Sequence, residues 1–177
     1  MAITIDATAG SAASNSFVTE VEQIAYMATR LNASAWTTIT GSTCTETEKA
    51  AMIEATRQLT LLHWEGDRVD TTQIQAWPRQ WAVNRDDPNQ DYFSTTVIPQ
   101  RVKDATAELA FQFVKQGTDD LAAADPNAGI IESTVDVITT RWETSGSRPQ
   151  GLNRFARIVQ LVSPMLDSTS GVSVVRG

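Results

Sequence analysis

Residues 45–79, TETEKAAMIEATRQLTLLHWEGDRVDTTQIQAWPR, contain the stretch around which the rest of the chain is organised. Thr45 and Glu48 have the spacing of a capping box, in which the hydroxyl and the carboxylate each pair with a backbone N–H at a helix start. Apolar residues then follow in steps of three and four, at Met52, Ala55, Leu59 and Leu62. This pattern predicts an amphipathic helix that Gly66 ends.

The second half of this stretch predicts a strap rather than more helix. Trp64 and Trp77 flank a turn, and large aromatic side chains with one N–H donor often mark the edge of a core or an interface. Pro78 disfavours helical backbone at Trp77, so we expect residues 77–79 to be extended.

Length and charge limit the function classes. A chain of 177 residues with 41% hydrophobic residues is long enough for one domain with a single core. The net charge of -7 opposes general attraction to phosphate backbones, because that affinity comes from clustered Lys and Arg. Nucleic-acid binding is therefore disfavoured by the overall charge.

The composition also argues against a membrane protein, a disulfide-linked protein and an enzyme. No apolar run reaches a membrane span and the start lacks the pattern of a signal peptide, so we expect a soluble protein made in a cytoplasm. Cys44 is a lone cysteine, and the single histidine, His63, has no nucleophile or acid at a recognisable spacing. We read both as structural residues, and we expect no catalytic residue, metal or cofactor.

Further elements follow from the same rules. We expect an edge strand at Ile3 and Ile5, a flexible connector over 10–16, and a helix over 19–31. The apolar face of that helix is predicted at Val21, Ile24, Ala25, Ala28 and Leu31. A third helix begins at Pro99, buries Val102, Ala105, Leu109 and Phe113, and ends at Gly117.

The last third predicts a hairpin, a helix and a tail. Alternating β-formers indicate a hairpin near 130–142, and Pro164 must end or bend a final helix. The apolar face of that helix is predicted at Leu152, Phe155, Val159 and Val162. The fold class is thus mainly α, a four-helix bundle-like subunit with a short β-hairpin and extended terminal segments. Residues 1–166 form the domain and 167–177 the tail.

Several pieces in order resemble one family. They are Asn15-Ser16-Phe17-Val18, Ala55-Thr56-Arg57-Gln58-Leu59, Trp64-Glu65-Gly66-Asp67-Arg68, Ala76-Trp77-Pro78-Arg79, and the run from Ile98 to Ala110, IPQRVKDATAELA. This ordered set resembles tailed-phage proteins often labelled DnaT-like single-stranded-DNA-binding proteins, many of which look like head–tail connector (adaptor) subunits. The resemblance covers about 15–165, and it departs at Asp136, where we expect glycine, and in the tail.

The resemblance implies a mainly helical virion protein, which is made in the host cytoplasm and located at the phage neck. Such a subunit forms a ring, typically of twelve copies, beneath the portal protein and above tail or nozzle proteins. DNA passes through the ring, and an acidic wall suits that passage because it does not grip phosphates. The alternative function is a single-stranded-DNA-binding replication protein.

Two interpretations of the strap follow from these alternatives. In one, Arg68, Trp77 and Arg79 form a small basic and aromatic groove around Trp64 for stacking bases. In the other, Arg68 or Arg79 stacks on a tryptophan and pairs with Glu65 or Asp67, so that a structural clamp holds the strap. We favour the clamp, which comprises Trp64, Arg68, Trp77, Pro78 and Arg79.

The C-terminal region predicts a docking element. Arg148, Arg154 and Arg157 are positive in an acidic protein, and Arg154 and Arg157 share one side of a helix. We expect them, with Val172, Val174 and Val175 of the tail, to contact the portal or a neighbouring subunit. The competing interpretation is an ordinary solvated helix face.

Overall fold

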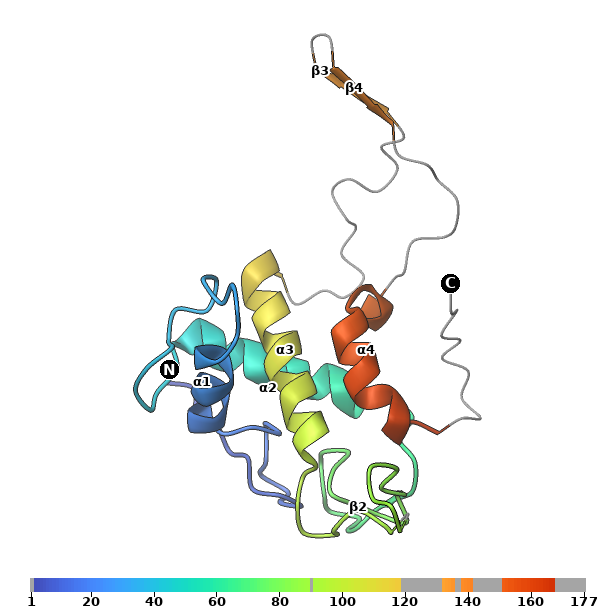
Figure 1. Ribbon diagram of the computed structural model, residues 1–177. Coiled ribbons are helices and arrows are strands. Elements are labelled where there is room, and N and C mark those ends of the chain that lie inside the picture. The colour runs from blue at the N-terminus through green and yellow to red at the C-terminus, as the bar shows by residue number, and fades with distance from the viewer. Residues whose placement is uncertain (1, 90, 119–131, 136–137, 142–150, 168–177) are drawn as a thin grey trace.

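The computed structural model describes residues 2–89, 91–118, 132–135, 138–141 and 151–167. Its α-helices are α1 (Glu20–Ala28), α2 (Glu46–Thr60), α3 (Gln100–Gln116) and α4 (Ala156–Val162), and short 3-10 helices cover Gly151–Arg154 and Ser163–Met165. Strand β1 (Asp67–Arg68) pairs with β2 (Arg79–Gln80), and β3 (Glu132–Val135) pairs with β4 (Ile138–Arg141), both antiparallel. The predicted mainly helical class is confirmed (Figure 1).

Helix α3 lies at the centre of the helical body, and α1, α2 and α4 each pack against it. Helix α2 crosses α3 instead of running beside it (Figure 1), so the bundle-like packing that the sequence predicts is not seen. The reason lies in α3 itself. Its buried residues extend beyond the predicted stripe of Val102, Ala105, Leu109 and Phe113 to Thr106, Ala107, Glu108, Ala110 and Phe111. A helix that is buried on several sides accepts neighbours at several angles.

The central helix begins as predicted and ends earlier. Both halves of the Thr45–Glu48 capping box are present, and Met52, Ala55 and Leu59 are fully buried. The helix ends at Thr60, because the indole of Trp64 folds back and its Nε1 donates to the carbonyl of Leu59. The prediction that Gly66 ends this helix was therefore wrong.

Gly66 instead allows a close approach between two backbone segments. It lies in the turn after α2 with φ +74°, and a Cβ added there would stand 2.3 Å from the carbonyl oxygen of Gln80. The backbone of the turn thus lies directly against the backbone at Gln80. This close approach is possible because glycine has no Cβ.

Helix α1 has the predicted Thr19–Glu22 capping box but a different buried face. It ends at Ala28, and its buried residues are Gln23, Ile24 and Met27, so only one member of the predicted stripe is buried. The amide of Gln23 donates to the carbonyl of Ala107 on α3, and this polar contact sets the orientation of the helix.

The N-terminal segment is ordered without being a strand. Ile3 donates its N–H to the carboxylate of Glu46, and the side-chain amide of Asn15 pairs with the backbone of Thr4 and Asp6. The predicted edge strand is absent from this described segment. The residues predicted as a flexible connector are held by these side-chain bonds and by backbone hydrogen bonds to the Asp6 carbonyl.

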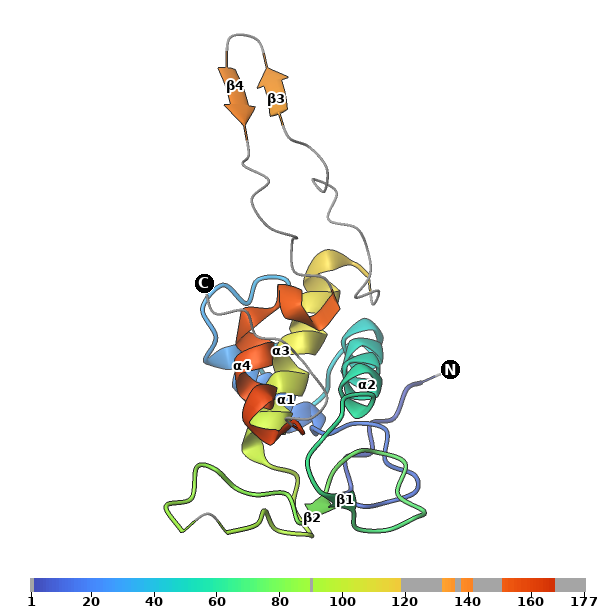
Figure 2. The ribbon, with the colours of Figure 1, turned by 90° about the vertical axis from the view of Figure 1, so that its right-hand side faces the viewer.

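The predicted hairpin is confirmed as β3 and β4, with Ser133 opposite Thr140. It lies away from the helices (Figure 2). The final helix is shorter than predicted, since α4 starts only at Ala156 and buries Ile158 and Val162. Of its predicted apolar face only Val162 is buried, because Leu152 and Phe155 precede α4, and these two residues and Val159 are only partly buried. Pro164 lies within the 3-10 turn that follows α4, as a residue that cannot continue the helix. Asp136 and residues 168–177 lie outside the described residues.

Glu48 does more than cap its helix. Its carboxylate accepts hydrogen bonds from the backbone N–H groups of Thr37, Thr38 and Thr45 and from the hydroxyls of Thr37 and Thr38. Burial raises the pKa of this carboxyl, but the hydrogen bonds outweigh burial and lower the pKa to about 2. The buried carboxylate therefore ties the 37–38 link to the start of α2.

We expect Glu48→Gln to remove part of the acid dependence of stability. Because the folded pKa of Glu48 lies below its ordinary value of 4.5, its contribution is full above pH 4.5 and is lost as pH falls towards 2. The loss in the native protein is about 2–3 kcal/mol. Urea unfolding at pH 7 and pH 2.5 measures this loss. A glutamine variant whose stability falls as steeply as the native protein's over this range would contradict the assignment.

Candidate functional site

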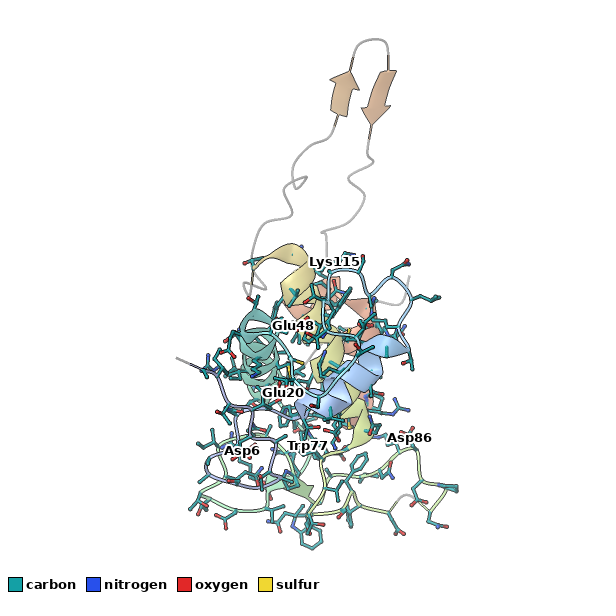
Figure 3. All side chains as sticks on the ribbon, turned by 90° about the vertical axis from the view of Figure 1, so that its left-hand side faces the viewer. Asp6, Glu20, Glu48, Trp77, Asp86 and Lys115 are labelled. Atoms are coloured by element: carbon teal, nitrogen blue, oxygen red, sulfur yellow. The ribbon has the colours of Figure 1, made fainter. Side chains whose placement is uncertain are left out.

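The strap is organised around a buried tryptophan. Trp77 is 0% exposed and makes edge-to-face contacts with Trp64 and Phe93, with ring centroids 5.6 and 5.5 Å apart. It sits at the lower end of the helical body in Figure 3. The structure thus brings together both tryptophans that flank the turn.

Arg79 fastens the strap by binding backbone carbonyls. Its Nε donates to the Glu65 oxygen at 2.8 Å, its Nη1 to the Ala76 oxygen at 3.2 Å and its Nη2 to the Trp64 oxygen at 3.2 Å. Nη2 also donates to the carbonyl of Gly66. Burial, and then the nearby Arg68, lower the pKa of Arg79. One guanidinium therefore closes the loop between the end of α2 and β2.

The chemistry of this clamp differs from the sequence prediction. We expected Arg68 or Arg79 to stack on a tryptophan and to pair with Glu65 or Asp67. Arg79 binds carbonyls instead, Arg68 donates to the Gln73 carbonyl at 3.2 Å, and Glu65 pairs with Arg85 at 2.8 Å. The carbonyl groups of a tight turn give the guanidinium of Arg79 several acceptors at once. The carboxylate of Glu65 is not available to Arg79 because it pairs with Arg85.

Pro78 is positioned by a buried amide. The Nε2 of Gln73 donates to the carbonyls of Gln75 and Pro78 at 2.8 and 3.0 Å. Beside this turn lies a pocket of about 370 Å³, which His63, Arg68 and Arg79 help to line. The guanidinium of Arg79 is already engaged by carbonyls. We therefore assign Gln73, Arg68 and Arg79 to holding the strap.

Cys44 lies buried near Glu20 and Glu48. Burial, and then these two carboxylates, raise the pKa of its thiol to about 12. The position before a helix could have lowered the thiol pKa, but the two carboxylates and the loss of water outweigh the helix. Among the described residues, no three His, Cys, Asp or Glu side chains lie close enough together to hold a metal ion.

The chain that follows the strap presents an aromatic pair that sequence reasoning did not single out. Trp81 is 60% exposed and Tyr92 is 57% exposed, and their rings meet edge to face at 5.5 Å. Trp81 has a left-handed backbone with φ +64°, and the close contact between Gly66 and the 80–82 backbone supports it from beneath. The sequence carries no periodic signal that separates Trp81 from the buried tryptophans.

A second cluster centres on a buried carboxylate of α3. Glu108 is 1% exposed, and it accepts hydrogen bonds from Nε of Arg30 at 2.8 Å and forms an ion pair with Nε of Arg157 at 3.0 Å. Arg157 also donates to the hydroxyl of Tyr26. Arg157, which we predicted to meet a partner protein, is therefore anchored within its own chain.

The other predicted interface residues fall into two groups. Arg154 lies in the 3-10 helix before α4, so it does not share an α-helical face with Arg157, and its guanidinium lies 5.7 Å from the ring of Phe155. Arg148, Val172, Val174 and Val175 lie outside the described residues.

The exposed basic residue Lys115 lies far from the part of the chain that carries the exposed aromatic pair. Figure 3 shows Trp77 and Asp86 at one end of the body. Lys115, in the last turn of α3, lies at the other end. Trp81 and Tyr92 stand before and after Asp86 in the chain, and their rings are in contact.

Among the residues that the structure describes, none of the helices has both the length and the apolar character of a membrane span.

Comparisons with known proteins give a family but no individual relative. Neither the search of curated proteins nor that of solved structures found a match. The family described as "Putative DnaT-like ssDNA binding protein" matches residues 1–177, the whole chain. This description agrees with the DnaT-like label in the resemblance and does not mention head–tail adaptors. The chain belongs to this DnaT-like family.

Proposed function

We propose that this chain is a structural head–tail adaptor (connector) subunit of a tailed bacteriophage, without catalytic activity, metal or cofactor. In this proposal it forms a ring of twelve copies in the virion neck, between the portal protein and tail or nozzle proteins. DNA passes through the ring without specific binding. The observation that supports the proposal is that most basic side chains of the described residues already pair with carboxylates of the same chain.

Most basic side chains of the described residues are paired with carboxylates of the same chain, although Arg30 and Arg157 share the one carboxylate of Glu108. Ion pairs to carboxylates engage Arg30, Lys49, Arg57, Arg85, Arg101, Lys103 and Arg157. Arg79 is turned inward to carbonyls. Since DNA affinity grows with each phosphate that a free cation neutralises, this surface is poorly suited to hold a nucleic acid.

The exposed apolar groups support contacts with proteins. Trp81, Tyr92, Ile74 and Val97 are each more than half exposed. Aromatic residues are enriched at the centres of protein interfaces. A single-stranded-DNA groove would instead interleave aromatic and basic side chains. Here Asp86, which stands between Trp81 and Tyr92 in the chain, lies at the end of the body opposite Lys115 (Figure 3).

The second candidate is single-stranded-DNA binding, and the family description favours it more directly than it favours an adaptor. The Trp81–Tyr92 pair is the part of the described surface that suits it, because exposed rings provide a platform for bases. Arg85 and Arg101 lie in and near the same region but pair with Glu65 and Asp86. Binding by this candidate would therefore require those ion pairs to open.

Fluorescence anisotropy with a labelled single-stranded oligonucleotide separates the two candidates. We expect a Kd weaker than about 0.1 mM at physiological salt. Electron microscopy of the protein mixed with the portal of the same phage should show added rings. Submicromolar DNA binding that weakens with salt and is lost in Trp81→Ala would establish the second candidate instead.

A further inference from the structure

A surface pocket of about 460 Å³ lies where the end of α1, the end of α3 and the start of α4 come together. Arg30, Lys115 and Arg157 line it, and none of its lining residues is acidic. This pocket is separate from the strap and from the residues that the sequence singled out around Trp64. Its charge is unusual in a chain with a net charge of -7.

A buried carboxylate orients the arginines that line the pocket. Glu108 lies beneath it and holds Nε of both Arg30 and Arg157. Arg30 is fixed further by the ring of Phe111, 4.0 Å from its guanidinium carbon. One buried carboxylate thus orients two guanidinium groups, and the exposed ammonium of Lys115 adds a third positive charge. Three cations over one carboxylate suit an incoming anion.

The rim of the pocket carries an apolar group. Leu31 is 87% exposed, and Asn32 follows it in a left-handed turn with φ +58°. Asparagine tolerates this conformation better than most residues. An exposed leucine beside three cations suits a protein partner that offers both carboxylates and apolar side chains.

The far end of the same body offers a matching surface. Asp91 and Tyr92 are exposed there, Trp81 meets Tyr92 edge to face, and Asp87 lies close by in the chain, whereas the carboxylate of Asp86 is already paired with Arg101. Figure 3 places Asp86 at the end opposite Lys115. Contacts between unlike surfaces of identical chains are heterologous, and they generate rings when the rotation closes.

We propose that the Arg30–Lys115–Arg157 pocket of one copy receives the carboxylate of Asp91, with Asp87 near it, from a second copy. The exposed Leu31 at the rim favours a protein partner over a nucleic acid, because an apolar side chain beside cations suits a surface that offers both carboxylates and apolar groups. The proposal rests on the proposed function in that copies of the chain must assemble.

Charge exchange tests this contact. Lys115→Glu and Asp91→Lys change two exposed side chains, and each is expected to weaken self-association at least tenfold in analytical ultracentrifugation at low salt. The double variant Lys115→Glu/Asp91→Lys should recover most of the association. A mixture of the two single variants should restore contact between unlike copies only. Arg57→Glu, an exposed charge reversal on α2, is the control and should associate as the native chain does.

The outcomes separate the two proposals. Native rings that tolerate both single variants, or a double variant as weak as either single one, would overturn the pocket contact and leave the adaptor function standing. A native chain that stays monomeric both alone and with the portal would overturn both. Oligonucleotide binding that Lys115→Glu abolishes would assign the pocket to phosphate and overturn the contact.

Discussion

Trp77→Ala is expected to lower the free energy of unfolding by about 3–5 kcal/mol, the range for truncating a large buried aromatic side chain. Trp77 is fully buried and contacts both Trp64 and Phe93 edge to face. Its loss leaves a cavity beside these two rings. Urea unfolding followed by circular dichroism measures the change, which is a large part of the stability of an ordinary domain.

Trp81→Ala is the matched control for this prediction. It removes the same kind of side chain four residues further along the chain, but from a ring that is mostly in water. Its effect on unfolding should stay below about 1 kcal/mol. If the two variants lost equal stability, the strap would not be packed on Trp77. If only Trp81→Ala reduced ring formation, the exposed pair would be assigned to an interface.

Local signals predicted the parts of the fold that local chemistry determines. Both capping boxes are present, because a hydroxyl and a carboxylate three residues apart pair with backbone groups of their own turn. The buried face of α2 followed from its spacing at Met52, Ala55 and Leu59, whereas Leu62 lies beyond the helix end and is only partly buried. Gly117 ends α3 in the left-handed conformation. These predictions needed no knowledge of what packs against the helix.

Predictions that depended on a neighbour were wrong in an instructive way. The buried face of α1 includes Gln23. A polar residue gives no hydrophobic signal in the sequence, but its amide donates to a carbonyl of α3 in the fold. The end of α2 is set by the indole of Trp64 and not by Gly66. In each case a hydrogen bond formed by folding outweighs the pattern of apolar residues.

The candidate sites show the same division. The sequence identified the strap and its arginines, because Trp, Pro and Arg stand close together in the chain. It did not identify which acceptors Arg79 would bind, since four carbonyls converge only when the turn folds. Nor did it identify the Glu108 cluster, whose members come from α3, α4 and the turn after α1.

Glu108→Leu should destabilise the protein by about 3–5 kcal/mol, because it leaves a partly buried guanidinium without its carboxylate. The side chain of Arg30 is only 15% exposed, whereas that of Arg157 is 64% exposed and can turn to water. Arg157→Gln should therefore cost less than about 1 kcal/mol. The cost of Glu108→Leu comes mainly from Arg30, and a second substitution at that residue can test this.

The double variant Glu108→Leu/Arg30→Met should recover most of the stability that the single variant loses. An apolar pair of similar volume needs no compensating charge, and replacing a buried ion pair in this way is often neutral. Urea unfolding of the native chain and the three variants gives the coupling between the two residues. A double variant as unstable as Glu108→Leu would show that packing against Phe111, rather than the charge of Arg30, is what Glu108 supports.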